Sequence, residues 1–551
     1  MKKILTLATL GLVALGAEQT AMAQSQTTGL ALGAQYESRG SARYQALSGA
    51  MGAVGADFSV VHQNPAALAL FRTGSKLSAT LSHSSYGGTS TWVDNSIETK
   101  SKSKLHFDEL SYMRATSLGS GKTLTWGIGI QNSGRFYRQM EAYTTQVGNA
   151  SVSDYVATLA SNIGNLAPSS LEGSNAFMNN PWLPTLAYNS YWIENTGSNP
   201  YTYKSAYTAA PQDASLMTTE TGAMSQFDFA LGAELSPRFS LGATLRFSSM
   251  NHEYRSYYQE SFQGVNTYVD DQGKTFAERH GLSLDNTVIS SSFGAGLGLG
   301  LLFQPVDGLR LGASFYTPTL YSVRMDFGAV STGISPTSTK KSGAWLTETP
   351  NTGATSFRFI SPWRVGLSGA YVFGRTAILS ADYEYQSLGQ GRLRTADEDE
   401  YGYSYTIDPE IYQEDNDAIS SDYGGQHTLR VGLEVNATRR LALRAGFRNT
   451  SGPSYDIGLS GDKAALEQLA QGTAVHYRLP GSVQGYSLGL GYRFTPKWTL
   501  DLAYVHRVQN DRVASFPFIR NDDTKQVAEP HAFIKDKQTQ STLSATLSYR
   551  F

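Results

Sequence analysis

The sequence predicts an all-β fold: a 14-stranded antiparallel transmembrane β-barrel with an N-terminal hatch, or plug, inside its lumen. Three observations predict it. The chain opens with an export signal and has no later apolar run long enough for a membrane helix. Its apolar residues alternate with polar ones in many segments, and the connections between those segments are alternately short and long.

The export signal occupies residues 1–23. Lys2 and Lys3 form a basic start, an apolar stretch runs from Ile4 to Gly16, and Ala21-Met22-Ala23 has the small-residue pattern of a cleavage site. We therefore expect a mature chain that begins at Gln24. An exported chain without a membrane helix is either soluble or a β-barrel.

Composition excludes several functions. The chain has no cysteine, which rules out disulfides and thiolate metal sites. A net charge of −2 without a basic patch argues against nucleic acid as a partner. None of the nine histidines has a serine or aspartate at a catalytic spacing, so we expect neither an enzyme nor a cofactor or metal.

Period-2 alternation decides between a soluble protein and a barrel. In the last segment Leu543, Leu547 and Phe551 alternate with Ser544 and its polar neighbours, so one face suits hydrocarbon and the other water. Fourteen such segments occur. Their spans are 75–87, 103–116, 122–135, 222–235, 238–255, 287–304, 309–327, 356–373, 376–393, 424–437, 441–450, 482–495, 498–512 and 539–551.

The connections support the same fold. Every second one is short, as at Ser236-Pro237 and Gly374-Arg375, whereas the longest runs from about Phe136 to Thr221. Short turns at one end and long loops at the other are typical of an outer-membrane barrel with periplasmic turns and extracellular loops. A soluble β-sandwich or propeller is the alternative, but it leaves the signal, the even count and the turn asymmetry unrelated. Residues 75–551 are therefore predicted to be the barrel.

Residues 24–74 precede the first strand and are the predicted hatch. Gly49, Gly52 and Gly55 recur at every third position among alanines, which permits close backbone packing but supplies little apolar bulk. Asn64 is suited to cap a helix and Pro65 to begin it, so Pro65–Phe71 is predicted to be a short helix.

This segment carries a family resemblance. From Gly40 to Gly74, its Gly/Ala-rich approach, Asp57 and the triplet Asn64-Pro65-Ala66 resemble the N-terminal hatch of the FadL/OmpP1/TodX family of outer-membrane hydrophobic-compound transporters. The resemblance implies a plugged barrel of 14 strands and passive uptake. It also implies a kink in the third strand that opens a lateral path, for which Asn132-Ser133-Gly134 is the candidate; glycine there equally marks an ordinary bulge. The implied hatch and gate residues are Gly49, Gly52, Gly55, Asp57, Asn64, Pro65 and Ala66.

Arginines recur at positions predicted to face the lumen. They either grip hatch groups such as Arg43 and Asp57 and bind a ligand carboxylate, or form ion pairs within the wall. The predicted charge network comprises Arg246, Arg310, Arg364, Arg430, Arg444 and Arg493.

The longest loop is rich in aromatic residues. It either captures an apolar ligand or folds over the mouth as a lid with its own small core, and the two are compatible. The predicted capture residues are Trp182, Leu186, Tyr188, Tyr191 and Trp192.

The first hypothesis for function is a monomeric channel of a Gram-negative outer membrane, gated by the hatch, for long-chain fatty acids or aromatic hydrocarbons. Its expected partners are the apolar ligand, membrane lipid and lipopolysaccharide. Lys100, Lys102 and Lys104 either meet lipopolysaccharide phosphates or are simple snorkelling side chains. The second is a FadL-like subunit or shuttle of a protein-secretion machine, with a protein partner at the extracellular loops. A general porin is the third.

Overall fold

A computed structural model provides the structure of the chain. It describes residues 39–119, 122–173, 175–198, 200–269, 273–336, 345–349, 353–396, 412–452, 473, 475–517, 519–520, 527–528 and 531–551. The predicted signal peptide, 1–23, and hatch residues 24–38 lie outside these ranges.

The predicted 14-stranded barrel is confirmed. Neighbouring strands pair in antiparallel order around the whole wall, and β24 (Ile534–Arg550) closes it on β1 (Ser75–Trp92). Several wall strands consist of two pieces. In order after β1 they are β2 (Asn95–Gly119), β3 (Lys122–Arg135) with β4 (Arg138–Thr144), β7 (Asp213–Ser236), β8 (Phe239–Val269), β9 (Thr275–Phe303), β10 (Leu309–Tyr316) with β11 (Leu320–Ile334), β13 (Gly353–Ile360) with β14 (Arg364–Phe373), β15 (Ala377–Ser387) with β16 (Arg392–Thr395), β17 (Gly425–Asn436), β18 (Leu441–Thr450), β19 (Tyr477–Leu479) with β20 (Val483–Arg493), and β21 (Trp498–Ala514).

Two of the interruptions that divide strands predicted to be continuous, 309–327 and 356–373, coincide with a proline, whereas a third, at 388–391 between β15 and β16, divides the predicted strand 376–393 without one. The first lies at Pro318 and the second at Pro362. Proline lacks the N–H that a ladder needs, so each of these strands divides at its proline.

The wall has the alternation that the sequence predicts. On β24 the side chains of Ser544 and Thr546 are buried toward the lumen, whereas Leu543 and Leu547 are exposed on the outside. The same pattern leaves large apolar side chains on the outer surface of strands all around the barrel. A belt of outward apolar side chains around a polar interior suits a hydrocarbon surrounding.

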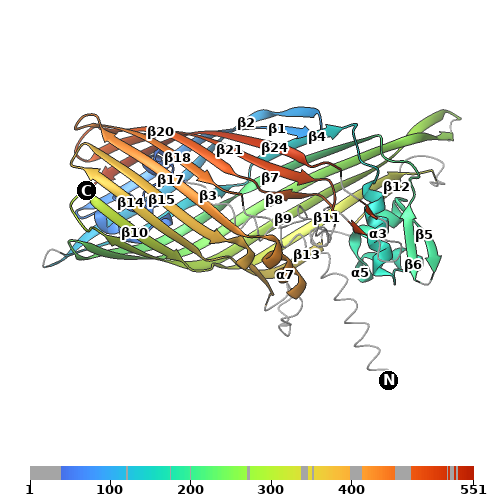
Figure 1. The fold of residues 1–551 in the computed structure, drawn as a ribbon, viewed down its shortest axis with the longest axis horizontal. Helices are drawn as coiled ribbons and strands as arrows, with labels where there is room; N and C mark the ends of the chain where they lie inside the picture. The colour runs from blue at the N-terminus through green and yellow to red at the C-terminus, as the bar shows by residue number, and fades with distance from the viewer. Residues whose placement is uncertain are drawn as a thin grey trace, which may run out of the picture.

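Two strands extend much further than predicted. β8 and β9 continue as a hairpin beyond the rest of the wall, and Figure 1 shows it projecting past the neighbouring loops. From Val265 to Val269 and from Thr275 to Arg279 these strands pair only with each other within the described part of the chain.

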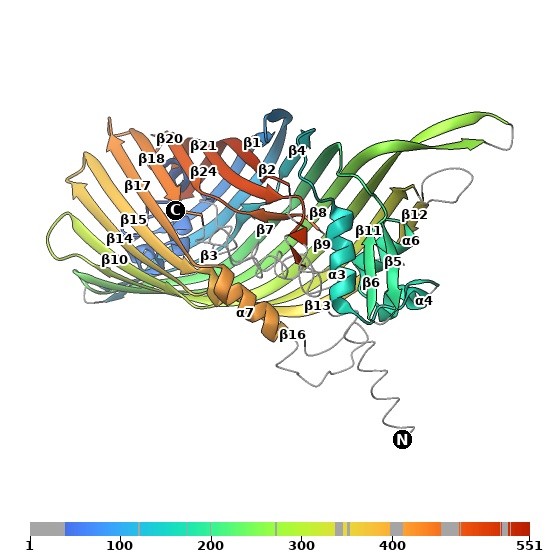
Figure 2. The same ribbon diagram turned by 45° about the vertical axis from the view of Figure 1, so that its right-hand side comes forward.

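A helical cap, residues 145–212, lies at the long-loop end of the barrel (Figure 2). Its elements are α3 (Val152–Ile163), α4 (Pro168–Leu171), α5 (Ala176–Asn179), α6 (Trp182–Asn189), β5 (Ile193–Ser198) and β6 (Tyr201–Ser205). Outside the wall and the cap, β12 (Trp345–Glu348) pairs with β11, β22 (Ile519–Arg520) pairs with β23 (Val527–Ala528), and η3 (Leu388–Gln390) and α7 (Gln413–Asp422) lie beside β16. Among the described residues, no helix is both long and apolar enough to cross a membrane.

The cap is anchored to the wall by a buried carboxylate. Glu260 on β8 accepts hydrogen bonds from the Val152 N–H at the start of α3, at 3.1 Å, and from the Tyr258 hydroxyl, at 2.6 Å. His531 lies 3.2 Å from the same carboxylate. These contacts fix the first turn of α3 to the extended part of β8.

The described part of the hatch, residues 39–74, lies inside the barrel near the end with the short turns. It contains α2 (Ala42–Ala46), η1 (Phe58–His62) and η2 (Pro65–Leu70), and nearly every residue from Arg39 to Ala69 is buried.

Candidate functional site

Three polar side chains begin the short helices of the hatch. Ser41 accepts a bond from the Tyr44 N–H, Asp57 from the Ser59 N–H, and Asn64 from the Ala66 N–H. The predicted cap at Asn64 and first helical position at Pro65 are therefore present. The element is a 3-10 helix that ends at Leu70, one residue short of the prediction.

Each of the three hatch glycines has its own geometric reason. Gly49 and Gly55 have φ values of 81° and 75°, in the left-handed region that favours glycine. Gly52 lies against β14, where a Cβ would stand 2.0 Å from the Ser368 hydroxyl. The Gly52 N–H donates to Asp382 at 2.9 Å.

Glycines of the wall meet the hatch from the other side. A Cβ at Gly242 on β8 would lie 2.2 Å from the Ala66 nitrogen, and one at Gly300 would lie 2.1 Å from the Asn64 side chain. Backbone cannot yield as a flexible side chain can, so these strand positions require glycine. The hatch and the wall thus approach each other at backbone distance around Asn64 and Ala66.

Side chains of the wall also satisfy the backbone carbonyls of the hatch. Ser380 donates to the Ala50 oxygen at 2.7 Å, and Ser487 donates to the Ala46 oxygen at 2.8 Å. Loops of this kind need partners for their backbone groups when they are buried. The hatch obtains these partners from strands far apart in the sequence.

The sequence analysis missed two further residues that contact the hatch, both on β2. A register shift against β1 makes a bulge that turns two consecutive carboxylates, Asp108 and Glu109, toward the lumen. Asp108 pairs with Arg39 at 3.3 Å and accepts from Gln45 at 3.1 Å, while Glu109 accepts from Ser59. Strict alternation would place one of two adjacent acids on the outer face of the barrel. The sequence pattern therefore did not predict that Asp108 and Glu109 both face the lumen.

Most of the predicted lumen arginines pair with wall carboxylates. Arg246 bonds Asp228 at 2.9 Å, Arg364 and Arg430 share Glu384 at 3.0 and 3.3 Å, and Arg444 bonds both Glu434 and Asp501 at 2.6 Å. The predicted network therefore includes the ion pairs of the wall.

Some of the same arginines also hold the hatch. Arg364 donates to the His62 carbonyl at 3.0 Å, and Arg310 donates to the Val54 carbonyl at 3.1 Å. From the hatch, Arg43 makes a two-pronged contact with Glu434 at 2.8 and 3.0 Å. Asp57 pairs with Lys76 at 3.4 Å, and Arg493 lies apart at the short-turn end.

His62 is a buried titratable group on the hatch. Its Nε2 lies 2.5 Å from the Gln131 side chain and its Nδ1 lies 3.2 Å from Arg246. Burial lowers the pKa of His62 to about 4, and the neighbouring Arg246 charge acts in the same direction. His62 is therefore neutral in the seated hatch at ordinary pH.

Lowering the pH from 6.5 to 4 is expected to favour release of the hatch. A released His62, with an ordinary pKa near 6.5, takes up a proton across this range, whereas the seated residue does not until about pH 4. Linkage then costs the seated form roughly 3 kcal/mol at pH 4. Planar-bilayer recordings should show that, across this range, openings of the intact chain increase relative to those of His62→Gln. His62→Gln should remove that increment, and an identical pH profile in the variant would contradict the assignment.

The wall is interrupted between β2 and the third wall strand. The ladder between β2 and β3 ends at Glu109 and Gln131, and residues 95–108 of β2 pair only with β1. β3 has a bulge at Ser133, within the predicted Asn132-Ser133-Gly134, and its continuation β4 pairs only with β7 among the described strands. We call this interruption the wall gap.

Side chains satisfy the backbone at the wall gap. Asn132 and Arg135 both donate to the Phe107 carbonyl, which has lost its ladder partner, and the Arg135 contact is 3.3 Å. The Lys104 ammonium lies 4.0 Å from the centre of the Tyr137 ring, across the gap. The part of β2 beside the gap carries three exposed lysines, Lys100, Lys102 and Lys104.

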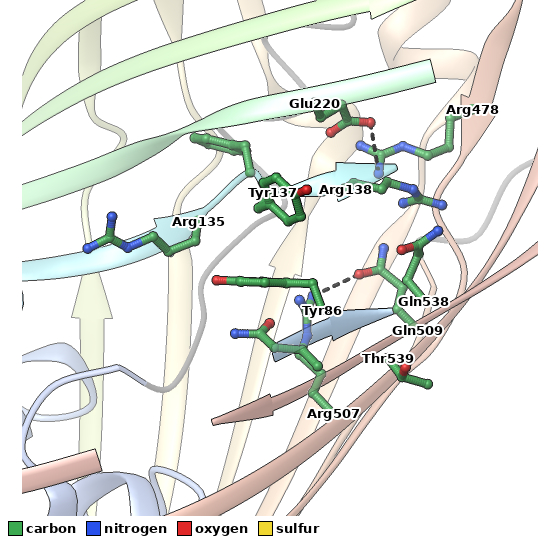
Figure 3. A pocket seen from close by; sticks show the side chains of 12 residues that line it. Tyr86, Arg135, Tyr137, Arg138, Glu220, Arg478, Arg507, Gln509, Gln538 and Thr539 are labelled. Carbon is green, nitrogen blue, oxygen red and sulfur yellow. Dashed lines mark hydrogen bonds and ion pairs between the residues drawn. The ribbon is translucent and has the colours of Figure 1, made fainter. Parts of the chain in front are cut away.

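A cavity of about 40 Å³ lies on the lumen side of the wall gap (Figure 3). Tyr86 and Tyr137 face each other there, with ring centres 4.9 Å apart. Deeper in, Arg138 crosses from β4 to Asp511 and Asp536, at 2.5 Å for the Asp511 contact. β4 is thereby held against strands on the far side of β1 and β2.

The predicted capture residues fall in the cap. The side chains of Trp182, Leu186 and Trp192 are buried, and Trp192 donates to the Thr332 carbonyl at 2.9 Å. Tyr188 and Tyr191 are half-buried. The loop thus folds over the mouth, which was one of the two predicted arrangements, but its buried side chains share their core with wall strands instead of forming a separate one. Ligand capture stays a prediction.

Together these features define a closed antiparallel barrel of 14 strands whose lumen holds an N-terminal hatch. Among solved structures, the chain is similar to a Pseudomonas aeruginosa FadL homologue, with 12% identity over 94% of this chain and 99% of that chain and a TM-score of 0.48. It is similar to the P. putida toluene transporter TodX, at 12% identity, 94% and 99% coverage and a TM-score of 0.47. It is also similar to the Ralstonia pickettii toluene transporter TbuX, at 12%, 93% and 99%, and 0.44. No protein-family model and no curated protein matches the chain.

Proposed function

We propose that the chain is a monomeric outer-membrane channel for hydrophobic small molecules, long-chain fatty acids or aromatic hydrocarbons, with residues 24–74 as its gate. The wall gap is the observation that carries this proposal. It is the place where β2, otherwise paired on both sides, has one open edge beside apolar outer residues such as Leu105 and Phe107.

The free-energy cost of an open strand edge suggests that the wall gap has a function. Unpaired backbone groups are expensive at membrane depth, so barrels normally close every ladder. Here Asn132 and Arg135 supply the missing donors to Phe107, so the interruption is stabilised by specific side chains. A stabilised gap beside a lumen cavity offers an apolar solute a sideways route into the bilayer, which avoids the polar, hatch-filled axis.

The cap and the hatch take complementary places in this scheme. The aromatic cap lies at the end where a ligand arrives, and the hatch closes the end with the short, periplasmic turns. Solute leaves the cap, enters the lumen and departs at the wall gap, or passes the hatch when it moves. Diffusion down a gradient is sufficient, because no step calls for a cofactor.

Cross-linking the wall gap is expected to reduce uptake to background. The chain has no cysteine, so Lys104→Cys and Tyr137→Cys can be joined by a short bis-maleimide with a reducible disulfide spacer. Uptake of labelled oleate and of toluene is measured in Gram-negative cells that lack their own carrier. Reduction of the spacer should restore transport.

The matched control joins two strands that are already paired. Tyr383 and Leu429 are opposite each other on β15 and β17 and are both exposed outward, so the same linker between cysteines at these positions should leave uptake unchanged. Full uptake with the gap cross-linked would exclude the lateral route. Loss of uptake in both pairs would point to a general effect of the linker.

A second candidate is a barrel that holds a protein partner at its extracellular loops, as a subunit or shuttle of a secretion machine. The extended β8–β9 hairpin favours it, because from Val265 to Val269 and from Thr275 to Arg279 the two strands pair only with each other among the described strands, so a partner strand can add beside them. Mass spectrometry of the protein purified from its native membrane discriminates the two. A stable protein partner without any bound apolar molecule would support the second candidate.

A further inference from the structure

A cavity with a strongly charged lining lies at the short-turn end, between the hatch and the wall strands β17, β18, β20, β21, β24 and β1. Its volume is about 460 Å³, within the range of small-molecule sites. It opens among the turn residues Thr438–Leu441 and Pro496–Lys497. It is distinct from the wall gap, which lies on β2 and β3.

The lining is strongly cationic. Eight lysine or arginine side chains face two carboxylates, Glu434 and Asp501. Both carboxylates are already engaged, because Arg43 and Arg444 bond Glu434 and Arg444 also bonds Asp501. The backbone oxygen of Phe551 lies beside Gly74, and Phe551 does not belong to the lining.

Four of the arginines have no acidic partner within the described residues: Arg439, Arg440, Arg493 and Arg550, of which Arg550 donates to Thr73 instead. Arg440, in the turn before β18, and Arg493, at the end of β20, are neighbours, since the Arg493 N–H donates to the Arg440 carbonyl at 2.9 Å. Guanidinium groups stay charged at any ordinary pH and present planar pairs of donors that match a carboxylate or a phosphate.

Part of the lining is apolar. Ala56 and Phe71 of the hatch line the cavity, with Leu441 and Pro496 of the wall, and the Arg550 guanidinium lies 5.2 Å from the centre of the Phe71 ring. A lining that combines cationic and apolar side chains matches a molecule that has an anionic head and an apolar body. Neutral hydrocarbons gain nothing from the cationic side chains, and a bare anion gains nothing from the apolar ones.

We propose that this cavity binds a small amphiphile whose anionic head, a carboxylate or a phosphate, meets Arg440 and Arg493 while its apolar part lies against Phe71. The site is on the periplasmic side of the hatch. Binding there is separable from the proposed uptake, because it can be measured on purified protein that transports nothing.

Calorimetry on the full chain in neutral detergent tests the proposal. The probes are octanoate and octyl phosphate, with octanol as the neutral counterpart and inorganic phosphate as the head alone. We expect both amphiphiles to bind and both counterparts to bind at least roughly tenfold more weakly, with an affinity that falls as salt rises. Comparing octanoate with octyl phosphate shows which head the site prefers.

Variants locate the site. Arg440→Gln with Arg493→Gln should weaken amphiphile binding by roughly tenfold or more, because two charged donors are lost. Arg238→Gln with Arg375→Gln is the matched control: both residues are exposed at other short turns and neither lines the cavity, so binding should be unchanged. Equal binding by the two double variants overturns the proposal. Octanol or phosphate alone binding as tightly as the amphiphiles overturns it as well.

Discussion

Deletion of residues 24–70 is expected to convert a closed barrel into an open pore. The described part of this segment is packed against both neighbouring and opposite strands, and a barrel of 14 strands is too wide for its wall side chains to fill. Single-channel conductance in planar bilayers should therefore rise roughly tenfold or more above that of the intact protein. Conductance equal to that of the intact chain would show that the segment does not close the lumen.

A smaller change tests whether the hatch or the helical cap closes the lumen. Replacing Asn64 and Pro65 with alanine removes the side chain that caps the start of η2 and the proline that fixes its first residue. Transient openings of the channel should therefore appear. The cap contains a matched dipeptide, Asn180-Pro181, whose Asn180 bonds the Ser170 and Ala176 carbonyls. Alanines there should leave conductance low. Openings in that variant alone would assign closure to the cap.

Glu384→Gln is expected to destabilise the barrel by roughly 3 to 5 kcal/mol. Glu384 is the shared partner of Arg364 and Arg430, whose side chains are 5% and 2% exposed. An amide cannot compensate two buried guanidinium charges, and one of these arginines also holds the hatch at His62. Urea unfolding in detergent, followed by tryptophan fluorescence, gives the change in free energy of unfolding.

The control for this substitution is the same chemical change at the surface. Glu253 pairs with Arg255 at 2.6 Å, but the side chains are 35% and 65% exposed. Glu253→Gln should therefore cost no more than about 1 kcal/mol. Similar losses of free energy of unfolding in the two variants would mean that solvent screens the lumen ion pairs as strongly as it screens a surface pair.

The wall could be predicted where the membrane imposes the alternation. The predicted strand 122–135 coincides with β3, because one of its faces meets hydrocarbon and the other meets the lumen. Beyond the membrane that constraint ends. β8 was predicted to end near residue 255 and β9 to begin near residue 287. Instead β8 continues to Val269 and β9 begins at Thr275, and the added parts carry polar residues on both faces.

The contacts of the site were harder to predict than the strands. Charged residues on lumen faces could be recognised from the alternation, but the partner of each depends on which strands lie opposite once the barrel has closed. Arg138 pairs with Asp511 and Asp536, nearly four hundred residues away. A bulge in β2 turns both Asp108 and Glu109 toward the lumen, and the alternation of residues around them does not reveal that a bulge is there.

The hatch bridges the seam between the first and last strands of the wall. Lys76–Thr91 of β1 is joined to β24 along nearly its whole length, and the hatch contacts both strands beside that seam. Asp57 pairs with Lys76 of β1 at 3.4 Å, and the Ala42 N–H donates to the Thr546 hydroxyl of β24 at 2.6 Å. The segment therefore ties the two ends of the barrel wall together as well as occupying its lumen.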